Sequence, residues 1–139
     1  MIDAEFLGEA NLTRKLLEAR ARAEEAMQRR LEALAAEMVA EMQALAPEAS
    51  GGLRESIRYE ADQTEDGPGV MIRAGGTPET ERPSASGHVF DNAVLQEYGT
   101  AHMPAQPFFN PTVDAFRSRI AEEAGAEAAS AVVEIIESE

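Results

Sequence analysis

Residues 88–111, HVFDNAVLQEYGTAHMPAQPFFNP, decide how this chain folds, because they concentrate its conformationally restricted and aromatic residues. The stretch contains three of the seven prolines, both histidines and three of the five phenylalanines. Gly99 suits a turn that a side chain would obstruct. Pro104 and Pro107 fix their own φ angles and push the residues before them towards extended conformations. The pattern therefore predicts a stiff, extended connection after Gly99.

Regular structure is expected on both sides of this connection. The apolar run in residues 88–97 fits a buried strand and a short helix equally well, and the sequence leaves this alternative open. On the far side, Asn110-Pro111 is typical of a helix N-cap followed by proline at the first helical position. We therefore predict a motif segment at 88–110 and a C-terminal helical segment at 111–137.

The C-terminal segment leaves two further points open. Gly125 could divide it into two helices, and the β-branched residues of 132–136 could form a strand instead. Beyond Arg119 the sequence has six acidic residues and no basic one. This end is therefore expected to form an acidic tail or rim.

A long helix is predicted over residues 11–45, with Asn11 or Thr13 as its cap. Its length is about 50 Å at 1.5 Å per residue, which exceeds the size of a small domain. We expect part of its apolar stripe to pack on a neighbouring subunit, the alternative being that the helix folds back on its own sheet. Residues 1–10 are expected to form a flexible N-terminus. Apolar residues recur at helical spacing at Leu12, Leu16, Ala23, Met27, Leu31, Leu34, Met38, Met42 and Leu45.

Two strands are predicted after the long helix. Residues 53–61 alternate between apolar and polar side chains, and residues 70–74 form a second apolar run. The polar, glycine-containing stretch between them reads as a turn, so residues 53–75 predict a β-hairpin. Residues 76–87 are taken as a mobile surface loop. The fold class predicted is α+β: a long N-terminal helix, a small antiparallel β-sheet with a hairpin, and a C-terminal helix or helices.

Two sequence blocks resemble a known family. Residues 96–111, QEYGTAHMPAQPFFNP, resemble the Glu-Tyr/Phe-Gly-Thr…Ala-x-Pro-Phe signature of a family of tailed-phage neck or tail-completion proteins. Residues 46–57, APEASGGLRESI, resemble the same family's Ala-Pro-x-Asp-Thr-Gly-x-Leu-Arg-x-Ser-Ile, with Ala49 and Ser50 as departures. Phe109-Asn110-Pro111-Thr112 also departs from the commoner Leu-Arg-Pro-Ala. The resemblance implies a structural or interface role for Pro47, Gly51, Leu53, Ser56, Ile57, Glu97, Tyr98, Gly99, Thr100, Pro104, Ala105, Pro107, Phe108 and Pro111.

Three of these residues invite a specific structural expectation. Tyr98 and Phe108 are expected to anchor the connection to the core. Glu97 could cap a helix or pair with an arginine.

Composition restricts the classes of function. The net charge is −14, with 26 acidic residues against 12 basic ones. Such a surface repels phosphate backbones, which argues against ordinary nucleic-acid binding. The chain has no cysteine, and no apolar run approaches the roughly 20 residues of a membrane span. Without a signal-peptide pattern at the N-terminus, we expect synthesis in a host cytoplasm and no membrane partner.

The spacing of the candidate metal-binding and nucleophilic residues does not indicate a catalytic site. A metal-dependent hydrolase would use His88, Asp91, Glu97 and His102, but their spacing matches no familiar metal motif. No serine lies in a nucleophile elbow, and no glycine-rich loop is followed by a lysine. We therefore expect no enzyme activity, no catalytic residue, no metal and no cofactor.

The resemblance implies a structural virion protein of the head–tail connector. Such a protein would form a homo-oligomeric ring, most often a hexamer in the tail-completion class. It would contact a head-closure or stopper ring on the portal-adaptor side and the tail tube or terminator on the other. DNA would pass through the lumen as cargo. The net charge alone equally suits an acidic module that masks a basic partner surface, and this alternative stays open.

Overall fold

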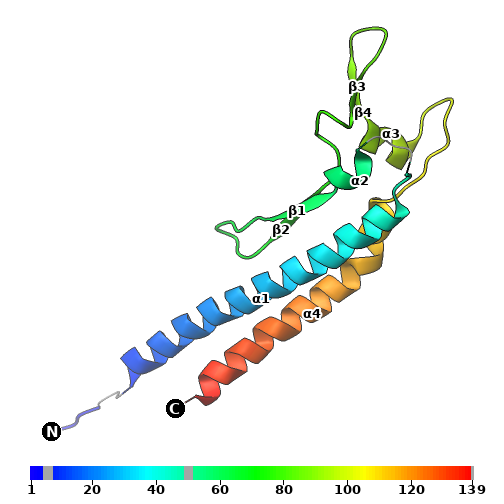
Figure 1. The fold of residues 1–139 in the computed structure, drawn as a ribbon. Coiled ribbons are helices and arrows are strands. Elements are labelled where there is room, and N and C mark those ends of the chain that lie inside the picture. Colours follow the sequence, from blue (N-terminus) through cyan, green and yellow to red (C-terminus); the bar gives the residue numbers. More distant parts are fainter. Residues whose placement is uncertain (5–7, 49–51, 139) are drawn as a thin grey trace.

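The computed structural model describes residues 1–4, 8–48 and 52–138, and its dominant feature is a pair of long helices. Helix α1 spans Glu9–Leu45 and helix α4 spans Asn110–Glu137. The two lie side by side and run in opposite directions, so both chain termini lie at the same end (Figure 1). We call this pair the stem and the end that carries the termini its open end. The predicted long N-terminal and C-terminal helices are confirmed.

The ends of these helices differ from the sequence prediction. Helix α1 begins at Glu9 with Gly8 as its N-cap, so neither Asn11 nor Thr13 caps it. Asn110 is the first residue of α4 and not its cap; Phe109 occupies the cap position and its side chain makes no capping bond. Helix α4 is continuous through Gly125 and through residues 132–136, because tertiary packing on α1 supports the helix despite its β-branched residues.

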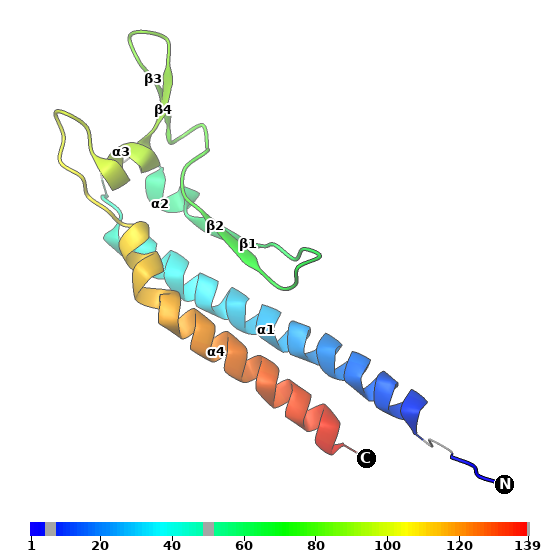
Figure 2. The same cartoon turned by 180° about the vertical axis from the view of Figure 1, so that it is seen from behind.

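A first antiparallel hairpin lies along α1. Strand β1, Arg58–Ala61, pairs with β2, Val70–Arg73, so that Tyr59 stands opposite Ile72. Both strands contact α1, as Figure 2 shows from behind. The hairpin is shorter than predicted, because residues 53–56 form one helical turn, α2 (Leu53–Ser56), and not a strand.

A second hairpin and a short helix complete the end of the molecule opposite to the termini. Strand β3, Glu81–Pro83, pairs with β4, Val89–Asp91, and the hairpin projects away from the stem (Figure 1). Residues 76–87 were predicted as a loop throughout; this was wrong, because part of the segment pairs with β4. The ambiguous run 88–97 contains both alternatives, since β4 leads directly into helix α3, Asn92–Tyr98.

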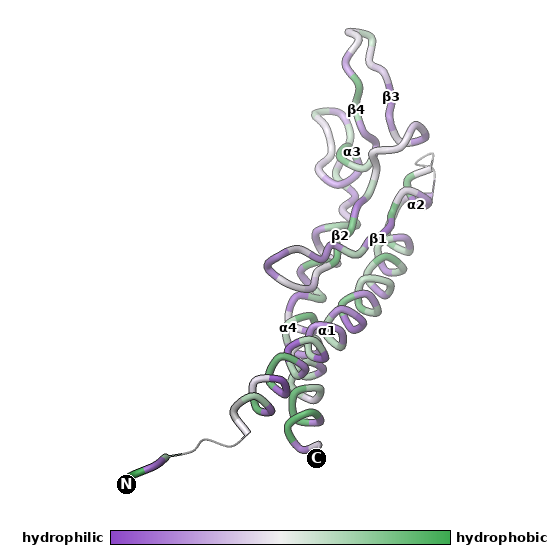
Figure 3. Tube along the Cα trace, turned by 90° about the vertical axis from the view of Figure 1, so that its left-hand side faces the viewer, coloured by the Kyte–Doolittle hydropathy of each residue, from purple (hydrophilic) through white to green (hydrophobic). Residues whose placement is uncertain are grey.

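The core lies where α2, α3 and the first hairpin meet the end of the stem that is farther from the chain termini. Its largest fully buried members are Phe108, Leu34, Met42 and Leu53. Buried apolar residues gather there, while hydrophobic and hydrophilic residues alternate along the tube of the stem helices (Figure 3). The core cluster comprises Met38, Met42, Ala46, Leu53, Ile57, Ala93 and Phe108, with Val113, Phe116 and Ile120 of α4 packed against it.

Gln28 fixes the first hairpin to α1. Its side chain is 6% exposed, and its amide both donates to the Gly69 carbonyl and accepts from the Gly69 N–H, each at 2.9 Å. This two-point contact ties to α1 a residue next to β2 whose carbonyl also accepts from the Asp62 N–H across the hairpin, at 2.9 Å. It sets the position of the hairpin along the helix.

Candidate functional site: the α3–α4 junction and its exposed loop

The carboxylate of Glu97 connects the end of α3 to the start of α4. Its Oε2 accepts hydrogen bonds from the N–H groups of Phe108 (2.8 Å) and Phe109 (2.9 Å), and its Oε1 accepts one from Asn110 (2.8 Å). These donors are the N–H groups of the first residue of α4 and of the two residues before it, where no intrahelical acceptor exists and the helix dipole favours an anion. Of the two predicted roles for Glu97, capping is therefore the one observed.

The chain leaves this junction and returns to it through residues 100–107, which we call the junction loop. Gly99 ends α3 with φ +73°, and a Cβ there would lie 2.7 Å from the Ala105 nitrogen. Only glycine avoids both the strained φ and the collision. The return of the loop is fixed by the Gln106 N–H, which donates to the Gln96 carbonyl at 2.7 Å.

The upstream sequence block meets the downstream one in the core. Leu53 is fully buried, Ile57 is buried, and both belong to the cluster that contains Phe108. Ser56 is also buried; its hydroxyl donates to the Leu53 carbonyl at 2.6 Å and accepts from the Gly75 N–H at 2.9 Å. Two blocks about 50 residues apart in sequence therefore form one structural unit.

Asp91 fixes the base of the second hairpin, a role that the sequence reasoning missed. Its Oδ1 accepts from the Ala93 N–H at 2.8 Å and caps α3, while its Oδ2 accepts from the Gly76 N–H at 2.6 Å. The hydroxyl of Thr80, which is fully buried, lies 3.4 Å from the same Oδ2. An aspartate directly before an apolar helical run is a recognisable cap signal, which could have identified this role from sequence.

The motif residues fall into a buried group and an exposed group. Tyr98 was expected to be an anchor, but this was wrong: it is 69% exposed, and its hydroxyl oxygen accepts from the Asn110 amide at 3.2 Å. Phe108 is 1% exposed, as predicted. Gly51 lies outside the described residues. The buried group is Leu53, Ser56, Ile57, Glu97 and Phe108; Pro47 and Gly99 are half-buried; the exposed group is Tyr98, Thr100, Pro104, Ala105, Pro107 and Pro111.

An open pocket of ≈ 340 Å³ lies beside the junction. Arg58 and Arg73 contribute cationic groups to its lining, while Tyr98 and Phe109 contribute aromatic rings. Arg58 donates to the Ser56 and Gly75 carbonyls, and Arg73 pairs with Glu60. Both cationic side chains that line the pocket are therefore already engaged by groups of the same chain.

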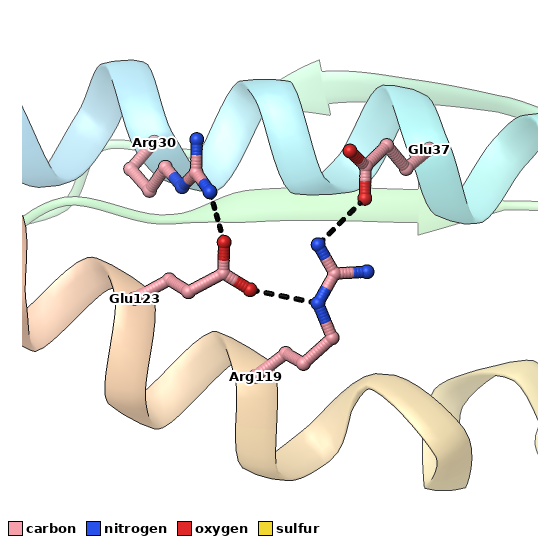
Figure 4. A network of polar contacts seen from close by, with 4 residues as sticks. All are labelled: Arg30, Glu37, Arg119 and Glu123. Atoms are coloured by element: carbon pink, nitrogen blue, oxygen red, sulfur yellow. Dashed lines mark hydrogen bonds and ion pairs between the residues drawn. The ribbon is translucent and has the colours of Figure 1, made fainter.

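A network of charged side chains joins the two helices of the stem below the core. Glu123 of α4 contacts Arg30 of α1, and Arg119 of α4 lies 3.0 Å from Glu37 of α1 and 2.7 Å from Glu123 (Figure 4). Hydrogen bonds from Arg119 and then Arg30 lower the pKa of Glu123, and the bond to Glu123 chiefly raises the pKa of Arg119. These contacts set the register of the stem.

The described part of the chain lacks the features of two other kinds of site. Within residues 1–4, 8–48 and 52–138, no group of three or more histidine, aspartate or glutamate side chains is placed to hold a metal ion. Of the residues considered for a metal, Asp91 and Glu97 instead accept backbone hydrogen bonds. Among the described helices, none combines the length and apolarity that crossing a bilayer requires.

Comparison with known proteins gives this geometry a context. A family model described as "Bacteriophage HK97-gp10, putative tail-component" matches residues 10–99, which run from the start of α1 to the turn after α3. Neither a curated protein nor a solved structure gives a significant match.

The matched segment defines a class of bacteriophage structural proteins, the components of the phage tail. The chain belongs to the HK97 gp10-like family of tail components. The match includes the upstream block and Glu97 to Gly99, and it ends before the junction loop.

Proposed function

We propose that this chain is a ring-forming component of the phage head–tail connector, acting in tail completion or as the tail terminator. Its role is geometric: copies close into a ring that joins head to tail and lets DNA pass. The observation that carries the proposal is the family match over residues 10–99. It agrees with the resemblance of the two sequence blocks to neck proteins.

The junction supports an assembly role in preference to catalysis. Glu97 and Gly99 hold both ends of the junction loop on the core, so the loop presents a defined shape. A surface ordered before binding loses less entropy when it docks, which favours a stable assembly contact. We propose that this loop contacts a neighbouring ring, either the head-closure or stopper ring on the portal-adaptor side or the tail tube. No enzymatic role is proposed.

The net charge of −14 suits a lumen through which DNA slides. Carboxylates repel the phosphate backbone and do not retain it. The same charge suits an acidic module that masks a basic partner, which is the second candidate function. The family match favours the virion component, because a masking module need not belong to a family of tail components.

The proposal is tested by removing the gene from the phage that encodes the chain. We expect DNA-filled heads and separate tails that do not join, with joining restored when the protein is supplied. Tails of uncontrolled length would assign the terminator role within the proposal. Normal yields of joined, infectious particles without the protein would overturn it.

Phage that carry altered junction loops refine this test. Replacing residues 104–107 by Gly-Ser-Gly-Ser should leave the protein folded but reduce joining, because Glu97 and Gly99 still hold the loop ends. A matched control places the same four residues at 63–66, in the turn between β1 and β2. Equal joining by both variants would count against a role for the junction loop.

A further inference from the structure

Exposed apolar side chains gather at the open end of the stem, far from the core. Three lie on α1 and two on α4, and each is between 50% and 63% exposed. Figure 3 shows the apolar last turns of α4 beside the C-terminus. Large apolar side chains clustered on one part of a small protein indicate a contact with another molecule. The residues are Leu12, Leu16 and Leu17 on α1, and Val133 and Ile136 on α4.

On α1, Leu17 lies on the side that faces away from α4. Lys15 marks the side that faces α4, because its ammonium donates to the Ser138 carbonyl at 2.6 Å. Leu17 follows two residues later, which is about 200° around the helix. Arg14 and Arg20 lie one turn before and one turn after Leu17, so they flank it on this outward face.

On α4, Val133 likewise lies on the side that faces away from α1. Ala124 is buried and marks the inward side, together with half-buried Ile120 in the core cluster. Val133 follows Ala124 by nine residues, which is about two and a half turns and therefore the opposite face. Glu137 lies one turn after Val133 on the same face, while Ile136 and Glu134 lie at its two edges. The two outward faces thus lie on opposite sides of the stem.

The register of the stem places these faces at one height. Lys15 contacts Ser138, and Arg30 contacts Glu123. Compared with the first contact, the second lies fifteen residues farther along α1 and fifteen residues back towards the start of α4. Each step forward along α1 therefore matches one step back along α4, and Leu17 lies level with Ile136. A second copy beside the first, without a shift along the stem, would therefore bring Leu17 against Val133 and Ile136.

The two helix segments that carry the outward faces are opposite in charge. Residues 10–22 of α1 hold four basic and one acidic side chain, a net charge of +3, in a chain whose overall charge is −14. Residues 126–138 of α4 hold three acidic side chains and no basic one, a net charge of −3. Glu134 and Glu137 lie at the C-terminal end of α4, where the helix dipole disfavours anions. A cationic neighbour would offset this unfavourable position.

Arg20, one of the two arginines that flank Leu17, is available for such a contact. Arg20 pairs with Glu24 at 3.1 Å, but both side chains are largely exposed, at 74% and 46%. Exposed pairs of this kind contribute little to stability, so a carboxylate of another molecule can compete for Arg20.

From these observations we infer that the outward face of α1 in one copy packs against the outward face of α4 in the next copy. Leu17 packs on Val133 and Ile136, while Arg14 and Arg20 meet Glu134 and Glu137. Two different patches are used, so the contact is heterologous and repeats around a ring or along a filament. The inference deepens the proposed function by assigning the contact between subunits, and it rests on that function for the ring.

A charge-swap experiment on the full chain tests this contact. One variant carries Arg14→Glu and Arg20→Glu, and a second carries Glu134→Arg and Glu137→Arg. Each alone has like charges on both faces and should associate at least tenfold more weakly than the unaltered chain in sedimentation velocity. Mixing the two should restore association, because each acidic face then meets a basic one. The control Glu65→Arg with Asp66→Arg changes the net charge by the same amount as the second variant but lies in the β1–β2 turn and should associate normally.

Disulfide trapping gives a second measurement that does not depend on charge. The chain has no cysteine, so Leu17→Cys and Ile136→Cys can each be the single thiol in its chain. Oxidation of the mixture should give mostly the mixed dimer, with few dimers of either variant alone. The helices should persist in both, since the replaced side chains are exposed; circular dichroism checks this.

Several results would overturn the inference. These are charge variants that associate as the unaltered chain does, a mixture of charge variants that does not recover, or an unaltered chain that stays monomeric at high concentration while the two cysteine variants form no mixed disulfide. Failure here would leave the head–tail role intact, since that role is judged in gene-deleted phage. Conversely, a deleted phage that still joins its tails would overturn the role while the swap could still succeed.

Discussion

The Oε2 atom of Glu97 lies 2.8 Å from the backbone nitrogen of Phe108, so a side chain near the end of α3 accepts a hydrogen bond from the backbone that leads into α4. The ring of Phe108 is buried in the core, while its N–H is held by this carboxylate. This contact connects the residue before Tyr98 and Gly99, where the junction loop begins, to Phe108, where the loop ends and the chain enters the core and α4.

Replacing Glu97 by alanine should destabilise the protein by about 3 kcal/mol, because three backbone donors, one buried and two partly buried, lose their acceptor. Glu97→Gln should cost less, since its single carbonyl oxygen still accepts from some of them. Urea unfolding at neutral pH measures both. Gln96→Ala is the matched control, because it removes a neighbouring side chain but keeps the backbone carbonyl that binds Gln106. Equal stability of the alanine variant and the unaltered chain would refute the capping role.

Two glycine-to-alanine changes should act in opposite directions. Gly99→Ala forces a Cβ to within 2.8 Å of both the Ala105 nitrogen and the Met103 carbonyl oxygen, at a φ of +73°. We expect a loss of about 1–3 kcal/mol. Gly125→Ala lies inside α4, where a Cβ meets nothing within 4 Å, so a gain of about 0.5–1 kcal/mol is expected. Thermal unfolding of both variants checks the signs, and a stabilising Gly99→Ala would contradict the turn geometry.

Gln28→Ala should release the first hairpin from α1. The change removes both hydrogen bonds to Gly69 and should cost about 1–3 kcal/mol. Faster amide hydrogen exchange over residues 58–73, with little change in the stem, would locate the effect. Gln63→Ala, an exposed glutamine in the same hairpin's turn, is the control. Unchanged exchange in the Gln28 variant would show that the hairpin is held by its apolar contacts alone.

Acid should weaken the stem through Glu123. The pKa of this carboxyl is lowered from its usual 4.5 by Arg119 and Arg30, so its contribution is fully present above that pH. It is lost as the pH falls through the lowered pKa. The unaltered chain should therefore melt at a higher temperature than Glu123→Gln at pH 7, and the difference should shrink below about pH 4.5 and in high salt. A difference that does not vary with pH would remove the electrostatic explanation.

The sequence predicted the parts of the fold that depend on local patterns. The 3.6-residue period over residues 11–45 predicted α1, and proline with glycine marked the connection around Gly99 and Phe108. Residues 53–56 were wrongly predicted to be part of a strand, because the spacing of Leu53, Ser56 and Ile57 is compatible with both a strand and a helical turn. The helical turn there is favoured by a tertiary contact, the hydrogen bond from the Gly75 N–H to the Ser56 hydroxyl.

The site was less predictable because neighbours in sequence have opposite environments. Tyr98 is the more apolar of the pair Glu97–Tyr98 and was expected inside, yet Glu97 is the buried residue. Its burial depends on donors eleven to thirteen residues later, which no local pattern reveals. Gln28 was missed for the same reason, since its partner Gly69 is 41 residues away.

Cryo-electron microscopy of the neck in the purified virion tests the central claim most directly. The account predicts a ring of this fold between portal and tail tube, with its junction loops against a neighbouring ring and acidic surfaces around the DNA. Virions whose neck and tail contain no density for this chain would contradict it.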